Sequence, residues 1–463
     1  MNCFWASQQQ STEGSMAEIF AFPAWRYNPA RVRWENVLTQ PYDKITPEMQ
    51  QRYAALDPCN LIAVEKGIAQ PADTPQNNVY TRAAAKLEEW AREGVLAQDA
   101  APAIYVYAQQ YVPPGGKTRR TRRGFIALGR VEDYAAGVVF RHEQTLAAPK
   151  ADRLELLRHT RAQTGQLFML YSDPTRKIDA LLNEAARGVP AMEMRDEYGV
   201  AHRLWSITDA QIIARVAAEM GEKKIVIADG HHRYETALAW RDECRARFAQ
   251  SDRHAPWEKA MMTFINAHGE GLTILPTHRV VGNLPGFDLA AFCKAMRPHF
   301  DWYAYPFTDA AEREAALAEF HKDFSARGKV RRAIGVYAGS GAFLLFLLRV
   351  DASLADLLPD VSPAQRELDV VLLHCVLLAQ GLGITAEAVV AEKHVSYARE
   401  MDAALGAVDA GRAQACFLLN PVRIEQVLEV ALAGQVLPQK STDFYPKLLS
   451  GVAIYRQEIP SAD

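Results

Sequence analysis

Strand-like and helix-like stretches alternate along almost the whole chain from Ala17 onward. Residues 103–109 and 124–128 are short apolar runs typical of strands, whereas residues 81–94 have the periodicity of an amphipathic helix. This alternation excludes an all-α or an all-β protein. The sequence therefore predicts the α/β fold class, in the form of a mixed α+β chain.

The same pattern predicts further elements and a division into domains. Helices are expected at residues 152–163, 177–186, 209–220, 309–324, 363–380 and 424–433. Strands are expected at residues 224–228, 332–337, 342–350, 415–419 and 452–455. At roughly 150 residues per domain, the chain should hold two to four domains. We expect a disordered tail at 1–15, with Met16 as the biological start, and α/β segments at 16–125, 126–285 and 286–463.

Charge and cysteine content exclude several classes of protein. The chain has 52 Lys and Arg against 55 Asp and Glu, so it lacks the basic excess of a nucleic-acid-binding protein. Its six cysteines form no C-x-x-C pair, which argues against disulfides and structural zinc and favours a reducing compartment. No apolar run approaches the ~18 residues that span a bilayer, and residues 1–15 lack the features of a secretory signal. We therefore expect a cytoplasmic protein without nucleic-acid or membrane partners.

The most informative stretch is residues 224–240, where an apolar strand runs into Asp-Gly and then into a helix. The first turn of that helix carries His231, His232 and Arg233. Free N–H groups and the positive end of the helix dipole favour an anion at such a place, and Gly230 permits close approach of the backbone. This pattern predicts a phosphate-binding site. The alternative is that Asp229 only caps the helix and the histidines are solvated.

The run at 230–237 resembles the nucleotide-binding motif of the ParB/sulfiredoxin superfamily, in which this helix start holds nucleotide phosphates. Its Asp-Gly-His-His-Arg form is most similar to that of the free serine kinases in that group. The resemblance implies a ParB/sulfiredoxin-like core at 126–285 and phosphoryl transfer from ADP or ATP to free L-serine. Where sulfiredoxin has a catalytic cysteine this chain has His231, so thiol-based repair of sulfinic acid is excluded at that position.

A second match is the segment at 141–145, which resembles the His-Glu segment that supplies the catalytic carboxylate of those kinases. The resemblance implies that Glu143 is the catalytic base, with His142 and Thr145 near the substrate. A hydroxyl is a poor nucleophile at neutral pH, so a positioned carboxylate is useful as proton acceptor. The alternative is an ordinary surface glutamate in a loop.

From Phe20 to Tyr455 the chain also resembles a widespread bacterial and archaeal family known as domain of unknown function 1015. The matching segments lie at 41–43, 142–145, 150–153, 229–234, 275–279 and 440–447. This resemblance indicates kinship and leaves the activity to be argued from the site.

Two of these segments add candidates for binding an anion. His278 and Arg279 follow a strand-like run, and their donors suit a carboxylate or phosphate. The loop at 440–447 combines two cations with two hydroxyls, and its candidate residues are Lys440, Ser441, Thr442 and Lys447. The alternatives are a turn with solvated basic residues and an ordinary polar loop.

The histidine spacing argues against a zinc enzyme, because adjacent histidines point in different directions and H-E-x-x-H is absent. Mg²⁺ shared between Asp229 and the phosphates of ADP or ATP is the expected cofactor, and no flavin or haem is expected. Neither a Walker A pattern nor a kinase glycine-rich loop occurs.

The sequence thus favours a phosphotransferase that acts on a small hydroxylated metabolite, with free L-serine as the best candidate. Its expected catalytic residues are Glu143, Asp229 and His231, and its phosphate-binding residues are Gly230 to Arg233. Two alternatives stay open. One is a ParB-type nucleotide switch without small-molecule catalysis, and the other is a phosphatase that uses the same site.

Overall fold

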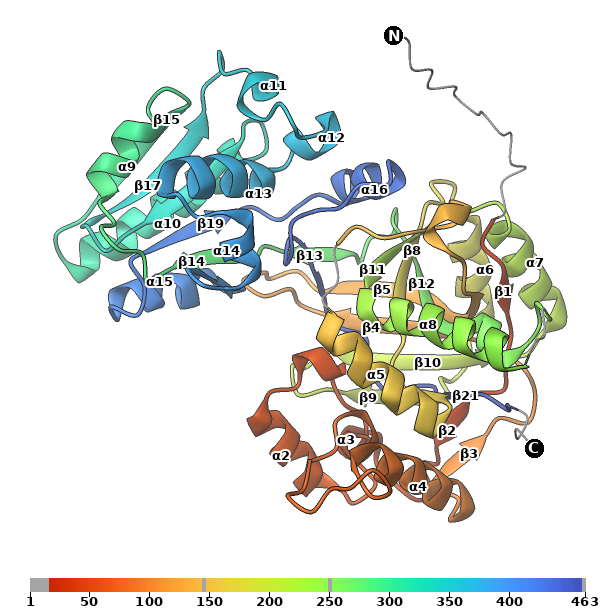
Figure 1. Cartoon of the computed structure of the whole chain (residues 1–463). Coiled ribbons are helices and arrows are strands. Elements are labelled where there is room, and N and C mark those ends of the chain that lie inside the picture. Colours follow the sequence, from red (N-terminus) through yellow and green to blue (C-terminus); the bar gives the residue numbers. More distant parts are fainter. Residues whose placement is uncertain (1–15, 144–146, 249–251, 460–463) are drawn as a thin grey trace, which may run out of the picture. The chain divides into compact units, whose positions relative to one another are not determined.

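The computed structural model describes residues 16–143, 147–248 and 252–459, which form two compact units (Figure 1). Unit 1 comprises Met1–Arg141, Thr145–Leu272 and Pro446–Asp463. Unit 2 comprises His142–Gln144 and Thr273–Tyr445. Unit 2 is therefore nested within the chain of unit 1, and the chain returns to unit 1 for its last segment.

In its described residues, unit 1 has a mixed sheet of nine strands in the order β6-β11-β8-β12-β5-β4-β10-β9, with β1 paired to β5. The strands are β1 (Ile19–Phe20), β4 (Ile104–Tyr111), β5 (Arg120–Arg130), β6 (Val139–Phe140), β8 (Leu167–Tyr171), β9 (Met192–Arg195), β10 (Ala201–Ile207), β11 (Ile225–Asp229) and β12 (Lys259–Asn266). β11 runs parallel to β6 and antiparallel to β8. β8, β11 and β12 are buried almost throughout, as expected for strands covered on both faces.

Unit 1 contains eight α-helices among its described residues. They are α1 (Trp34–Val37), α2 (Pro47–Leu56), α3 (Ile62–Glu65), α4 (Val79–Arg92), α5 (Ala147–Thr160), α6 (Lys177–Ala185), α7 (Ala210–Met220) and α8 (His231–Phe248). The side chains of α6, α7 and α8 share one apolar core with the sheet. α8 lies beside α5 in Figure 1, and the two helices are in contact. Two small two-stranded sheets pair β2 (Trp25–Tyr27) with β3 (Leu96–Gln98) and β7 (Ala162–Gln163) with β21 (Tyr455–Arg456).

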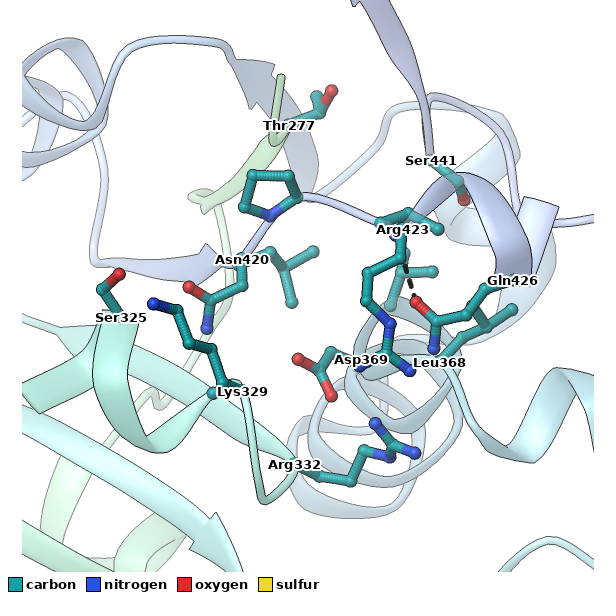
Figure 2. A pocket seen from close by; sticks show the side chains of 15 residues that line it. Thr277, Ser325, Lys329, Arg332, Leu368, Asp369, Asn420, Arg423, Gln426 and Ser441 are labelled. Atoms are coloured by element: carbon teal, nitrogen blue, oxygen red, sulfur yellow. Dashed lines mark hydrogen bonds between the residues drawn. The ribbon is translucent and has the colours of Figure 1, made fainter. Parts of the chain in front are cut away.

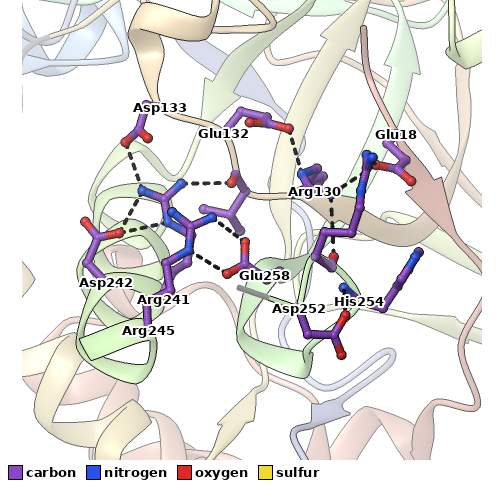
Figure 3. Close-up of polar contacts among 12 residues, drawn as sticks. Glu18, Arg130, Glu132, Asp133, Arg241, Asp242, Arg245, Asp252, His254 and Glu258 are labelled. Carbon is purple, nitrogen blue, oxygen red and sulfur yellow. Dashed lines mark hydrogen bonds and ion pairs between the residues drawn. The ribbon is translucent and has the colours of Figure 1, made fainter. Parts of the chain in front are cut away.

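A network of ion pairs attaches the middle of α8 to the neighbouring loops (Figure 3). Arg241, which is 2% exposed, donates to the carbonyl of Val131 at 3.0 Å and to Asp133 at 2.9 Å. Arg245 donates two hydrogen bonds of 2.6 Å to the carboxylate of Glu258, whose side chain is 2% exposed. The buried charge of Glu258 is thus neutralised by a fork-shaped guanidinium.

In its described residues, unit 2 has a six-stranded sheet in the order β15-β17-β16-β19-β14-β18. The strands are β14 (His278–Val281), β15 (Phe300–Pro306), β16 (Ala333–Tyr337), β17 (Ala342–Leu348), β18 (Val395–Ala398) and β19 (Ala415–Leu419). β13 (Thr273–Leu275) and β20 (Asp443–Tyr445) form a separate pair. The longer helices are α9 (Leu289–Met296), α10 (Ala310–Arg327), α15 (Met401–Asp409) and α16 (Ile424–Leu432). A second apolar core lies between α10, α15 and the sheet.

The helix predicted at 363–380 is interrupted. The structure has α12 (Pro363–Arg366), α13 (Asp369–Leu372) and a π-helical segment η4 (Leu373–Gln380). α12 begins with a capping box between Ser362 and Gln365. Two residues after its end, Leu368 has an extended backbone, with φ of −108° and ψ of 124°. The break at Leu368 allows Asp369 to begin a new helix.

The α/β fold class predicted from the sequence is confirmed, in its mixed form. The division into units differs from the three consecutive segments expected. β5 runs across the expected boundary at 125/126, and because it pairs with β4 on one side and β12 on the other, a boundary there would split one sheet. The expected linker at 282–286 is a loop inside unit 2. The expected tail at 1–15 lies outside the described residues.

None of the helices in the described residues is long and apolar enough to cross a membrane.

Candidate functional site

The turn between β11 and α8 is the predicted phosphate-binding segment, and its backbone requires glycine. Gly230 has φ of +93°, and a Cβ atom there would lie 3.0 Å from Nη2 of Arg233. A residue with a side chain would strain the turn and crowd the guanidinium. Tyr234 N donates to the carbonyl of Gly230 at 3.0 Å, which starts the helix immediately after the turn.

Positively charged groups surround the carboxylate of Asp229 at the end of β11. Lys447 Nζ lies 3.5 Å from Oδ1, and Nη2 of Arg233 lies 3.6 Å from Oδ2. Burial alone would raise the pKa of Asp229, but Lys447, Arg233, Lys44 and His231 together hold it well below its usual range. Asp229 is therefore ionised at neutral pH, among more positive than negative groups.

Arg233 is folded back against the turn. Its side chain is 14% exposed, and Nη1 donates to the carbonyl of Gln166. Its Nε is shielded from solvent and has no acceptor among the described residues. Of the two histidines, His231 is buried and His232 is partly exposed. Both lie in the first helical turn, where backbone N–H groups have no partner within the helix.

The backbone around Lys447 is fixed by hydrogen bonds from side chains of β4 and β5. The buried guanidinium of Arg122 donates to the carbonyl of Pro446, and Gln109 Nε2 donates to the carbonyl of Lys447 at 2.8 Å. Burial lowers the pKa of Arg122 to about 10, so it still carries its charge at neutral pH. Neither Arg122 nor Gln109 was predicted as a site residue, because both lie in an ordinary strand pattern.

A small cavity of about 60 Å³ adjoins Arg233 and is lined by Tyr42, Glu65 and Arg153. The guanidinium of Arg153 lies 4.3 Å from the centre of the Tyr42 ring. The buried carboxylate of Glu65 accepts hydrogen bonds from Thr164 at 2.6 Å and from Ser450 at 2.9 Å. Tyr42 and Arg153 belong to segments that carried the family resemblance, and the structure brings them close to Arg233.

Other predicted residues come together in unit 2. His142 Nε2 lies 2.8 Å from the hydroxyl of Thr442, and that hydroxyl donates to Oε1 of Glu143 at 3.2 Å. Because the hydroxyl has one proton, His142 Nε2 is the donor in the first of these bonds. His142 is fully buried, and Leu437 N donates to its carbonyl at 2.7 Å. Glu143 is partly buried, and its Oε1 also accepts a hydrogen bond from the backbone N–H of Thr442.

His278 and Arg279 are buried at the start of β14 and have protein partners. Burial and the nearby Arg279 lower the pKa of His278 to about 4, and its Nδ1 accepts from Leu419 N. Arg279 donates to the carbonyl of Thr277 at 2.5 Å, to the carbonyl of Gln439 at 3.0 Å and to His374 at 3.1 Å. These contacts anchor the strand, and a role in anion binding stays a prediction.

The remaining predicted residues are placed as follows. Lys440 is exposed, with φ of +57°, and the hydroxyl of Ser441 donates to the carbonyl of Pro438. Thr145 lies outside the described residues. Asp229 and Glu143 belong to different units. Within the described part of the chain, no cluster of three or more His, Cys, Asp or Glu could hold a metal ion.

The fold and the turn define a two-unit α/β protein with a cationic strand–glycine–helix site. A family model described as "Protein of unknown function (DUF1015)" matches residues 19–371. The chain belongs to this family.

Three solved structures are similar over much of their length but at low TM-scores. A conserved hypothetical protein from Pyrococcus furiosus is 12% identical, with 67% of this chain and 89% of that chain covered and a TM-score of 0.31. A free serine kinase variant in complex with ADP is 11% identical, with 66% and 84% covered and a TM-score of 0.32. C-terminally truncated SbnI from Staphylococcus aureus is 11% identical, with 70% and 85% covered and a TM-score of 0.33. No curated protein matches the chain.

Proposed function

We propose that the turn between β11 and α8 binds the phosphates of ADP or ATP, and that the protein transfers a phosphoryl group to a small hydroxylated metabolite. The observation that supports this most directly is the surplus of positive charge around one ionised carboxylate at a helix start. Lys447, Arg233, Lys44 and His231 all act on Asp229. An anion with several charges, such as a diphosphate, suits such a place.

Asp229 fits the expected role as a ligand of Mg²⁺. Magnesium is usually bound through one or two carboxylates together with phosphate oxygens. Asp229 is ionised and its side chain is 22% exposed, so it can take part. The ion would neutralise charge on the phosphates, while Gly230, His231, His232 and Arg233 hold them at the helix start.

The proposed acceptor of the phosphoryl group is free L-serine, because the Asp-Gly-His-His-Arg motif resembles that of the free serine kinases. The hydroxyl of serine must lose its proton during transfer, and Glu143 is the proposed acceptor of that proton. Thr442 donates two hydrogen bonds to Oε1 of Glu143, and the other oxygen has no donor among the described residues. Because Glu143 belongs to unit 2, its role is tested separately from the phosphate site.

Phosphate binding is tested with Arg233→Ala and the matched control Arg215→Ala, an exposed arginine on α7. A charge-assisted hydrogen bond to phosphate contributes about 1.5 to 3 kcal/mol. We therefore expect Arg233→Ala to weaken ADP and ATP binding by roughly 10- to 150-fold in calorimetry with Mg²⁺ present. Arg215→Ala should bind like the wild type. Absence of nucleotide binding in the wild type, or equal affinity in both variants, would overturn the phosphate site.

Catalysis is tested with Glu143→Gln against Glu314→Gln, an exposed glutamate on α10. The measurement is formation of O-phosphoserine from L-serine and ADP or ATP. We expect Glu143→Gln to keep nucleotide affinity and to lower turnover by a factor on the order of 10² to 10⁴. Turnover at the wild-type rate would remove Glu143 from the mechanism. Nucleotide binding without any transfer would instead indicate a nucleotide switch, and hydrolysis of O-phosphoserine a phosphatase.

A further inference from the structure

Unit 2 contains a cavity of about 360 Å³ at the ends of two central strands of its sheet (Figure 2). β16 and β19 are antiparallel, with Ile334 opposite Leu419, so the start of β16 and the end of β19 lie side by side. The loop before β16, the loop after β19 and the start of α13 all contribute to the cavity wall. The break in the predicted helix at 363–380 is what allows α13 to begin there.

Three cations line this unit 2 cavity: Lys329, Arg332 and Arg423. Arg332 forms an ion pair with Glu367. Lys329 and Arg423 have no carboxylate within 4.0 Å among the residues that the structure describes, and both are exposed. The cavity therefore has two positive charges that the described protein does not neutralise by an ion pair.

One carboxylate, Asp369, lines the same cavity without an ion pair in the described part of the chain. In Figure 2 it lies between the side chains of Lys329 and Arg423. Its Oδ1 is shielded from solvent and accepts no hydrogen bond from a described residue. Burial raises the pKa of Asp369 to about 7, although Arg332, the amide of Ala333 and Arg423 act to lower it. A ligand with a hydrogen-bond donor could therefore bind to Oδ1 of Asp369, which has no donor among the described residues.

The size of the cavity limits the ligand. At ~30 Å³ for each water, a volume of about 360 Å³ holds roughly a dozen waters, so a metabolite of about a dozen non-hydrogen atoms fits. Leu368, Val370 and Leu419 give the wall an apolar part. An aliphatic segment between charged ends suits this mixture.

We propose that the unit 2 cavity binds a small acidic amino acid. Its anionic groups face Lys329, Arg332 and Arg423, and its ammonium group donates to Asp369. This site uses none of the residues of the phosphate site in unit 1, and the proposal does not depend on the function proposed above.

The test is calorimetry on the full chain at pH 8, where Asp369 is ionised, with L-glutamate and with glutarate. Glutarate has the same two carboxylates and lacks the amine. We expect saturable binding of both, tighter for L-glutamate. Lys329→Gln and Arg423→Gln should each weaken L-glutamate binding by about tenfold. Lys322→Gln, an exposed lysine of α10 outside the cavity, is the matched control and should bind like the wild type.

Asp369→Asn separates the role of the carboxylate from that of the cations. It should abolish the preference for L-glutamate over glutarate and keep glutarate binding. Arg233→Ala should leave L-glutamate binding unchanged, which separates this site from the phosphate site. No saturable binding of L-glutamate, equal affinity for inorganic phosphate and L-glutamate, or wild-type affinity in Lys329→Gln and Arg423→Gln would each overturn the proposal.

Discussion

Asp229 and Asp369 are carboxylates whose pKa values are shifted in opposite directions by their surroundings. Asp229 is held ionised by Lys447 and Arg233 at 3.5 and 3.6 Å. Asp369 has no ion pair among the described residues, and burial raises its pKa to about 7. The folded protein therefore stabilises the ionised form of Asp229, whereas it favours the neutral form of Asp369.

The raised pKa of Asp369 predicts a pH-dependent stability. An aspartate in the unfolded chain titrates near 3.9. The stability contributed by the neutral carboxyl is therefore present below about pH 4 and is lost as the pH rises to about 7. The charged groups around it are Lys329, Arg332, Arg423 and Glu367.

Asp369→Asn removes this titration. As the pH rises from 5 to 8, the wild type loses this stability and the variant does not. We therefore expect the difference in unfolding free energy between the variant and the wild type to grow by on the order of 1 to 3 kcal/mol over this range. Urea unfolding at both pH values measures the difference. Parallel pH profiles of the two proteins would show that Asp369 is not held neutral.

The sequence predicted the strand, glycine and helix of the turn, but not the contact between Asp229 and Lys447. Asp229, Gly230 and Arg233 are adjacent in the chain, so a local pattern of strand, glycine and helix could reveal them. Lys447 was predicted as an anion-binding residue in another loop, 218 positions from the aspartate that it contacts. No local periodicity encodes such a contact, which depends on the path of the whole chain.

At the scale of elements, the attachment of α8 depends on a charge pair that the sequence pattern does not reveal. Arg245→Ala would leave the carboxylate of Glu258 buried without its guanidinium. Removing one partner of a buried pair costs about 3 to 5 kcal/mol, and the 40% exposure of Arg245 reduces this to roughly 2 to 3 kcal/mol. Urea unfolding should show this loss. Arg247→Ala, an exposed neighbour on α8, should change stability by less than about 0.5 kcal/mol, and an equal effect of both would contradict the role of the pair.

The interrupted helix shows where element prediction fails. Residues 370–379 are apolar except for His374, and residues 364–369 contain no Gly or Pro, so the sequence predicts one helix over 363–380. The extended backbone at Leu368 divides it, and Asp369 then begins α13 at the unit 2 cavity. The strands 415–419 and 333–337 were found because they are short apolar runs bounded by turn residues. The cavity between their ends was not predicted, because its lining comes from five separate segments.

At the scale of the whole molecule, unit 1 needs the last segment of the chain. Leu449, Val452 and Ile454 are buried, and β21 pairs with β7. A chain that stops at Tyr445 loses these side chains, each of which contributes about 1.5 to 3 kcal/mol on burial. In hydrogen exchange, we expect β8 and β11 to lose protection in that truncated chain while β16 and β19 keep theirs. Equal protection of both sheets would contradict a separate dependence of unit 1 on this segment.

The nested order of the two units also sets a sequence of events during synthesis. The ribosome makes the chain from the N-terminus to the C-terminus, so every residue of unit 2 has been made before Pro446. Unit 2 can therefore complete its sheet while unit 1 still lacks its last strand. Lys447 joins Asp229 only after every residue of unit 2 has been made. A nascent chain that stops before Lys447 consequently lacks one of the cations around Asp229, and a nucleotide bound at the proposed phosphate site would selectively stabilise chains that extend past it.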